Sequence, residues 1–229
     1  MHVIAGCVRA GRIFVSRLLN WLRSSYPSDT VGNKHKIYRY IPIEITKDLK
    51  WWYEFLPVFN GVSMMAVEEW SYPDTVCSCD TCLEGLGGMF EEQFFHAIFP
   101  PFLTEQNVHI NCLELLTIVV SLRTWGKYMT GKRILVFCDN EASVQVLNSG
   151  HTRDAFMQNC LREICFYAAN LQFEVKAKHI SGENNRLPDY LSRWEIDNKY
   201  RTLFKNSIRD RICHEIDITD DHFNFIHKW

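Results

Sequence analysis

The sequence lacks both a long apolar run and a strong excess of charge of either sign. No stretch reaches the roughly 18 uninterrupted apolar residues that a membrane-spanning helix requires, so we expect no membrane partner. The formal net charge is −2 at pH 7, whereas nucleic-acid-binding domains are usually basic overall. Any surface for nucleic acid must therefore be a local one.

A secretory signal, internal repeats, low-complexity segments and a long Gly/Ser linker are also absent from the sequence. The 9 cysteines are an odd number, and without a secretory signal they favour reduced thiols in an intracellular protein, cytoplasmic or nuclear. The 229 residues, of which 47% are hydrophobic, suffice for one or two globular domains with a sizeable core.

Residues 1–72 are expected to form a mostly helical connecting region. The first helix is predicted over residues 1–24. Its predicted apolar side consists of Ile13, Leu18, Leu19 and Leu22. A transit peptide is the alternative interpretation, because this stretch is rich in arginine and contains no acid before Asp29.

A second helical pattern occupies residues 44–61, with Thr46 as the predicted N-cap and Gly61 after its end. Its aromatic stripe is typical of a buried core rather than of a binding platform. The stripe consists of Trp51, Trp52, Phe55, Leu56 and Phe59.

Residues 73–195 alternate between strand and helix patterns, and residues 196–229 follow as a C-terminal extension with one further helix and strand. Strands are predicted at 74–82, 87–93, 94–100, 132–139 and 171–180, and helices at 111–129, 140–150, 153–171 and 185–193. The order βββαβααβα predicts an α/β fold: a mixed five-stranded sheet with helices on its faces.

Four acids lie in or directly after four different predicted strands and helices. Asp80 lies in the first strand, Glu114 on the apolar side of the long helix, and Asp139 at the end of a buried strand. Asp189 lies in the last short helix. Ligands gather at the carboxyl ends of strands in α/β sheets, and clustered carboxylates need cations between them. Their oxygen atoms suit Mg²⁺ or Mn²⁺.

Each acid also has a purely structural interpretation. Asp139 can cap the helix that follows it, and Asp189, after Pro188, can be a first-turn acid favoured by the helix dipole. Glu114 can be a half-exposed helix residue. The joint pattern of the four acids favours the metal site.

The motifs around these acids resemble those of retroviral-type ribonuclease H. The segment CDTCLEGLGG is similar to its first-strand motif, NCLELL to its helix-borne Glu, and FCDNEASV to its second strand-end Asp. The segment HISGENNRLPDYLSR is close to the closing motif H-x-P-G-x-x-N-x-x-A-D-x-L-S-R. The segments before and after these motifs resemble the connecting regions of DIRS-type retroelement polyproteins.

The resemblance implies hydrolysis of the RNA strand of RNA–DNA hybrids with two ions of Mg²⁺ or Mn²⁺. It implies Asp80, Glu114, Asp139 and Asp189 as metal ligands, and His179 as the histidine that assists product departure or proton transfer. It also implies a reverse transcriptase domain as partner in the parent polyprotein. The chain itself contains no Tyr-x-Asp-Asp polymerase motif. Candidate contacts to the hybrid backbone are Arg153, Lys176, Lys178 and Arg186.

The closing motif departs from the pattern at two positions. Ser181 stands where proline is usual, and Pro188 where alanine is usual. Proline is tolerated in a first helical turn, but Pro188 is expected to shift Asp189 slightly.

Three other interpretations compete with this one. A transposase or integrase is suggested by Asp80, Asp139 and Glu174, although Glu174 falls in a predicted strand and that acid should come from a helix. The second is a catalytically weak or inactive hybrid-binding remnant of a polyprotein. The third is a zinc site, but Cys77 and Cys79 fit one apolar strand face. The remaining zinc candidates are Cys82, Cys213, His214, His222 and His227.

Overall fold

The structure, a computed structural model, describes residues 9–25, 40–58 and 72–227. The chain divides into two compact units, residues 1–68 and 69–228. The described part of the smaller unit contains α2 (Arg9–Ser25), α3 (Ile43–Phe55) and the 3-10 helix η2 (Leu56–Val58). Within the described ranges, no helix is long and apolar enough to cross a membrane.

An aromatic core joins α2 to α3. The ring of Phe14 lies 4.7 Å from that of Trp51, which stacks on Phe55 at 4.6 Å between centroids. Arg17 Nε donates to Oδ2 of the buried Asp48 at 2.8 Å. The prediction that Trp51, Trp52 and Phe55 are core residues is therefore confirmed.

Three details of these helices were predicted wrongly. Of the predicted apolar side of α2, Leu18 and Leu19 are half-buried, Leu22 is exposed, and the side chain of Ile13 lies outside the described residues. The residues that α2 buries are Phe14 and Val15. Thr46 is not the N-cap, because α3 begins after Pro42, whose carbonyl accepts the hydrogen bond of the Thr46 hydroxyl. Leu56 is also exposed, while Phe59 and Gly61 lie outside the described residues.

The larger unit begins with three strands and ends with helices around a short sixth strand. Its elements are β1 (Thr75–Thr81), β2 (Gly85–Phe90), β3 (Gln93–Ile98), α4 (Pro101–Thr104), α5 (Ile110–Trp125), η3 (Gly126–Met129), β4 (Arg133–Cys138), α6 (Glu141–Ser149), α7 (Ala155–Leu171), β5 (Glu174–His179), η4 (Gly182–Asn184), α8 (Arg186–Ser192), α9 (Asn198–Ser207), β6 (His214–Glu215), η5 (Asp220–His222) and η6 (Asn224–His227).

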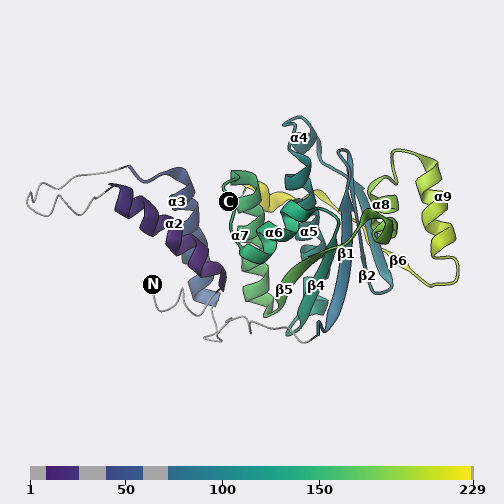
Figure 1. The fold of residues 1–229 in the computed structure, drawn as a ribbon, viewed down its shortest axis with the longest axis horizontal. Coiled ribbons are helices and arrows are strands. Elements are labelled where there is room, and N and C mark those ends of the chain that lie inside the picture. The colour runs from purple at the N-terminus through teal and green to yellow at the C-terminus, as the bar shows by residue number, and fades with distance from the viewer. Residues whose placement is uncertain (1–8, 26–39, 59–71, 228–229) are drawn as a thin grey trace, which may run out of the picture. The chain divides into compact units, whose positions relative to one another are not determined.

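The strands form one mixed sheet in the order β5-β4-β1-β2-β3-β6 (Figure 1). β1 pairs antiparallel with β2 and parallel with β4, and β5 runs parallel to β4. The predicted α/β class and mixed sheet are confirmed, but the sheet has six strands rather than five. The extra strand, β6, comes from the C-terminal extension and pairs with Gln93 and Phe94 of β3.

Helices cover both faces of the sheet. On one side lie α5, α6 and α7, and on the other lie α8 and α9 (Figure 1). Glycines of β2 let α8 come close: a Cβ atom at Gly87 would stand 2.3 Å from Leu191 Cβ. The neighbouring Gly88 faces the opposite side, where a Cβ would meet the Phe95 ring at 2.7 Å. The glycine-rich strand is therefore a packing requirement.

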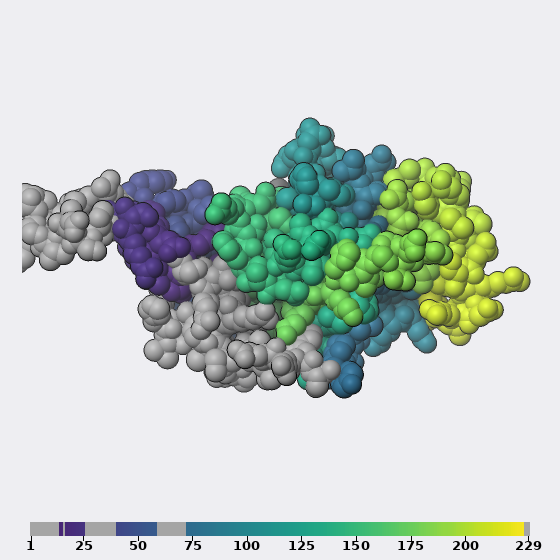
Figure 2. All heavy atoms as spheres, viewed as in Figure 1, coloured from purple at the N-terminus to yellow at the C-terminus, as the bar shows by residue number. Residues whose placement is uncertain are grey.

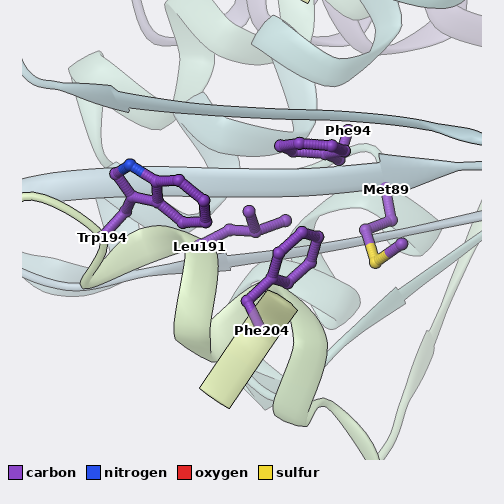
Figure 3. Close-up of a cluster of buried hydrophobic side chains, with 5 residues drawn as sticks. All are labelled: Met89, Phe94, Leu191, Trp194 and Phe204. Atoms are coloured by element: carbon purple, nitrogen blue, oxygen red, sulfur yellow. The ribbon is translucent and has the colours of Figure 1, made fainter. Parts of the chain in front are cut away.

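A second hydrophobic cluster attaches α9 to α8 and to the sheet. It consists of Met89, Phe94, Leu191, Trp194 and Phe204 (Figure 3). The C-terminal extension is consequently part of the same compact unit. At the surface, the yellow-green residues at the end of β5 and in the loop after it are exposed, between the green helices and the yellow C-terminal segment (Figure 2).

Candidate metal centre

Asp80 lies near the end of β1, next to the start of α5. The following residue, Thr81, turns to the α5 side of the sheet, where its hydroxyl lies 3.4 Å from Leu113 O and also bonds the hydroxyl of Thr117. These contacts hold the first turns of α5 against the end of β1. Glu114, which follows Leu113, is thereby placed beside Asp80.

Asp139 follows the last residue of β4 and has no capping role. The N-cap of α6 is Asn140, whose Oδ1 accepts the Ser143 amide hydrogen at 2.9 Å. Asn140 Nδ2 also donates to Asn111 Oδ1 at 2.9 Å, which ties this turn to α5. The capping interpretation of Asp139 is therefore wrong, and its carboxylate is left for another role.

Asp189 lies in the first turn of α8, as the helix-dipole interpretation requires, but its side chain is also paired. Asp189 Oδ1 accepts a hydrogen bond from Arg193 Nε at 2.7 Å. Pro188 does not break the helix, because the amide of Asp189 still donates to Asn185 O at 3.1 Å. A proline in the first turn removes only an amide that lacks an intrahelical partner anyway.

The four carboxylates form one electrostatic cluster. Asp80 and Glu114 are each 4% exposed, so Glu114 is not the half-exposed residue of the structural interpretation. Burial, followed by the charges of Asp139 and Asp189, raises the pKa of Asp80 to about 7, although the Ser192 hydroxyl opposes the shift. Burial, followed by Asp80 and Asp139, raises the pKa of Glu114 to about 9.

The chemistry of these groups fits a divalent cation. Oxygen atoms of Glu114 and Asp139 and the sulfur of Cys138 lie within 4.8 Å of one another. Burial raises the pKa of the Cys138 thiol well above its ordinary value, so this group stays protonated and the carboxylates are the better ligands. Among the described residues, no lysine or arginine forms an ion pair with Asp80, Glu114 or Asp139. A divalent cation could therefore supply positive charge at this cluster.

His179 stands at the edge of this cluster. It is exposed, and its Nε2 lies 3.1 Å from the carbonyl oxygen of Asp139. A carbonyl only accepts, so this contact requires the hydrogen on Nε2 and leaves Nδ1 as the basic nitrogen when the ring is neutral.

The candidate backbone contacts come from three different parts of the fold. Lys176 and Lys178 lie on β5, opposite Leu135 and Phe137 of β4. Phe137 in turn lies opposite Ser78, two residues before Asp80, so both lysines point to the same face of the sheet as Asp80. Arg153, before α7, and Arg186, at the start of α8, are both exposed.

Three residues of the closing motif that have no predicted role hold the site together. Asn185 Nδ2 donates to Cys79 O at 2.9 Å, which fixes α8 to β1 beside Asp80. Ser192 donates to Asp80, and Arg193 to Asp189. The spacing of four residues between Asp189 and Arg193 on a helix was a sequence signal for their contact.

Two competing interpretations can be located in the fold. Glu174 pairs in register with Arg133 at the start of β4, whereas Asp139 follows the end of that strand. Six residues of strand separate the two positions by about 20 Å, so Glu174 is far from the other acids.

The zinc interpretation involves Cys77 and Cys79. Both are buried on one face of β1, as predicted.

No protein-family model matches the chain, and no curated protein matches it significantly. The observations that bear on its function are the geometry of the carboxylate cluster and the motifs of this sequence.

Proposed function

We propose that the chain is a metal-dependent endonuclease of the ribonuclease H type, which hydrolyses the RNA strand of RNA–DNA hybrids during retroelement reverse transcription. One observation carries the proposal: Asp80, Glu114, Asp139 and Asp189 converge from β1, α5, the end of β4 and α8. Packing does not explain such convergence, because buried carboxylates without cations are costly. The order of the elements that carry them supports the same assignment.

The four carboxylates would hold two ions of Mg²⁺ or Mn²⁺. When bound, such ions activate a water and stabilise the leaving 3′-oxygen of an in-line displacement at phosphorus. The chain supplies the position of the ligands, their charge and their partial shielding from solvent. His179 lies at the exposed edge of the cluster, where Nδ1 can accept a proton while Nε2 stays bonded to Asp139 O.

The substrate assignment follows from the motifs and from the surface beside the site. Lys176 and Lys178 share the sheet face of Asp80, where a phosphate backbone would meet them. With Arg153 and Arg186 they are the candidate backbone contacts. The 2′-hydroxyl group distinguishes the RNA strand from DNA. A reverse transcriptase domain in the parent polyprotein is the proposed partner.

The test is cleavage of an end-labelled RNA–DNA hybrid in Mg²⁺ by the wild type and by Asp139→Asn. We expect the variant to lose more than about 100-fold in rate, because changes in residues that merely support metal ligands already cost 10–100-fold. Asp74→Asn is the matched control, since Asp74 is an exposed acid that precedes β1 and pairs with Arg133. It should cleave like the wild type. Equal rates for Asp139→Asn and the wild type, or no cleavage by either, would refute the proposal.

A further inference from the structure

The last residue of α8, Ser192, contacts the candidate metal centre directly. Its side-chain oxygen lies 2.7 Å from Asp80 Oδ2 and 3.0 Å from the main-chain oxygen of Asp189. A hydroxyl has one hydrogen to donate, and a bond to a carboxylate is the shorter and stronger choice. Ser192 therefore donates to Asp80 whenever that carboxylate is ionised.

The main chain of Ser192 is also held in place. Cys82 Sγ lies 3.1 Å from Ser192 O, and a Cβ atom at Gly85 would stand 2.5 Å from the same oxygen. From the same face of β2, a Cβ at Gly87 would stand 2.6 Å from the Ser192 amide nitrogen. The residue is only 2% exposed. Its hydroxyl is thus fixed by the fold and cannot act as a mobile surface group.

The bond determines how Asp80 presents its oxygens. One lone pair of Oδ2 is occupied by Ser192, which leaves Oδ1 and the other lone pair of Oδ2 for a cation. A carboxylate oriented in this way loses less conformational freedom when it binds a cation, and its ligand geometry is set in advance.

We propose that Ser192 is a positioning residue for metal binding, whose hydroxyl holds the Asp80 carboxylate in the orientation that a divalent cation requires. The inference rests on the metal site of the proposed function. It assigns Ser192 no contact with substrate and no part in bond making. Its effect is on the affinity of the centre for the ion.

The experiment measures Mn²⁺ binding to the metal-free protein by electron paramagnetic resonance, and the Mn²⁺ concentration that gives half-maximal hybrid cleavage. Ser192→Ala should weaken Mn²⁺ binding by about 10–100-fold and shift half-saturation equally, while excess Mn²⁺ restores the maximal rate. Because the ion also stabilises a partly unfolded variant by mass action, binding is compared only among variants whose circular dichroism spectrum without metal matches that of the wild type. Ser121→Ala is the matched control, because it removes a buried hydroxyl that bonds only a helix carbonyl, Thr117 O.

A second pair of variants keeps the test valid if Ser192→Ala does not fold. Ser192→Thr and Ser192→Val have nearly the same shape, and only the threonine retains a hydroxyl. The proposal requires tighter Mn²⁺ binding by the threonine variant. Equal binding by the two, or Mn²⁺ binding by Ser192→Ala within about threefold of the wild type, overturns it.

The two proposals fail in different ways. A wild type that binds Mn²⁺ but cuts no hybrid refutes the nuclease function and still allows the Ser192 comparison. A wild type that cuts hybrids, with Ser192 variants that bind Mn²⁺ normally, refutes only the positioning role. A wild type that binds no Mn²⁺ refutes both.

Discussion

Replacement of Glu114 by glutamine should stabilise the metal-free protein, and the gain should grow with pH. Burial and the neighbouring Asp80 and Asp139 raise the pKa of Glu114 from 4.5 to about 9. The folded protein therefore holds a proton on Glu114 that the unfolded chain releases above pH 4.5. Because the folded state binds more protons in this interval, the free energy of unfolding falls as pH rises from about 4.5 to about 9.

The magnitude follows from linkage. Each pH unit within the interval costs the wild type about 1.4 kcal/mol, so at pH 7.5, about three units above the ordinary pKa, the cost is about 4 kcal/mol. Glutamine keeps the shape and does not titrate. The free energy of unfolding of Glu114→Gln minus that of the wild type should thus increase steadily from pH 5.5 to 8.5.

Urea unfolding in EDTA at several pH values measures this difference. Glu141→Gln is the control variant, because Glu141 is an exposed acid at the start of α6. It measures how the same change of net charge alters the free energy of unfolding at an exposed position. Saturating Mg²⁺ should reduce or reverse the stability advantage of Glu114→Gln over the wild type, because the ion binds the folded wild type and stabilises it by mass action. A difference between Glu114→Gln and the wild type that does not change with pH would refute the account of the cluster.

Two further predictions concern the same centre. Gly87→Ala should lower the free energy of unfolding by about 1–3 kcal/mol and weaken Mn²⁺ binding, because the new methyl group pushes α8 away. Gly88→Ala is the control on the opposite face of the sheet, and it should lower stability but leave Mn²⁺ binding intact. Binding of Mg²⁺ should release protons, and its affinity should rise between pH 6 and 9, since the raised pKa values of Asp80 and Glu114 keep protons at the site; calorimetry in buffers of different ionisation enthalpy counts the protons, and an affinity independent of pH would contradict the prediction.

The sequence predicted the α/β class, the first five strands and the four longer helices among them, because each has a period or a continuous apolar run with polar or glycine breaks at its ends. It did not predict α4, which has only four residues. It also predicted one further helix and strand after residue 195, where α9 and the two-residue β6 lie, but not that this strand pairs with β3 and extends the sheet. The buried side of α2 was also misjudged, since Phe14 becomes core only through its contact with Trp51 of α3. Which residues of a helix become buried depends on the helix that packs against it, and a periodic pattern does not specify that helix.

The sequence singled out the four acids that the structure brings together, but it did not predict which residues surround them. Asp139 and Asn140 are adjacent and both residue types cap helices well, so only the structure assigns the cap to Asn140. The bond between Ser192 and Asp80 joins residues 112 positions apart, which no local pattern reveals. The burial of Glu114 depends on how α6, α7 and the sheet surround α5.

The most direct test of the central claim is to identify the products of hybrid cleavage by the wild type in Mg²⁺. In-line attack of water at phosphorus with a leaving 3′-oxygen predicts cuts in the RNA strand only, with 5′-phosphate and 3′-hydroxyl ends, and no cleavage in EDTA. Ends bearing a 5′-hydroxyl and a cyclic phosphate, cleavage that persists in EDTA, or an intact RNA strand would contradict the assignment of Asp80, Glu114, Asp139 and Asp189 to a nuclease metal centre.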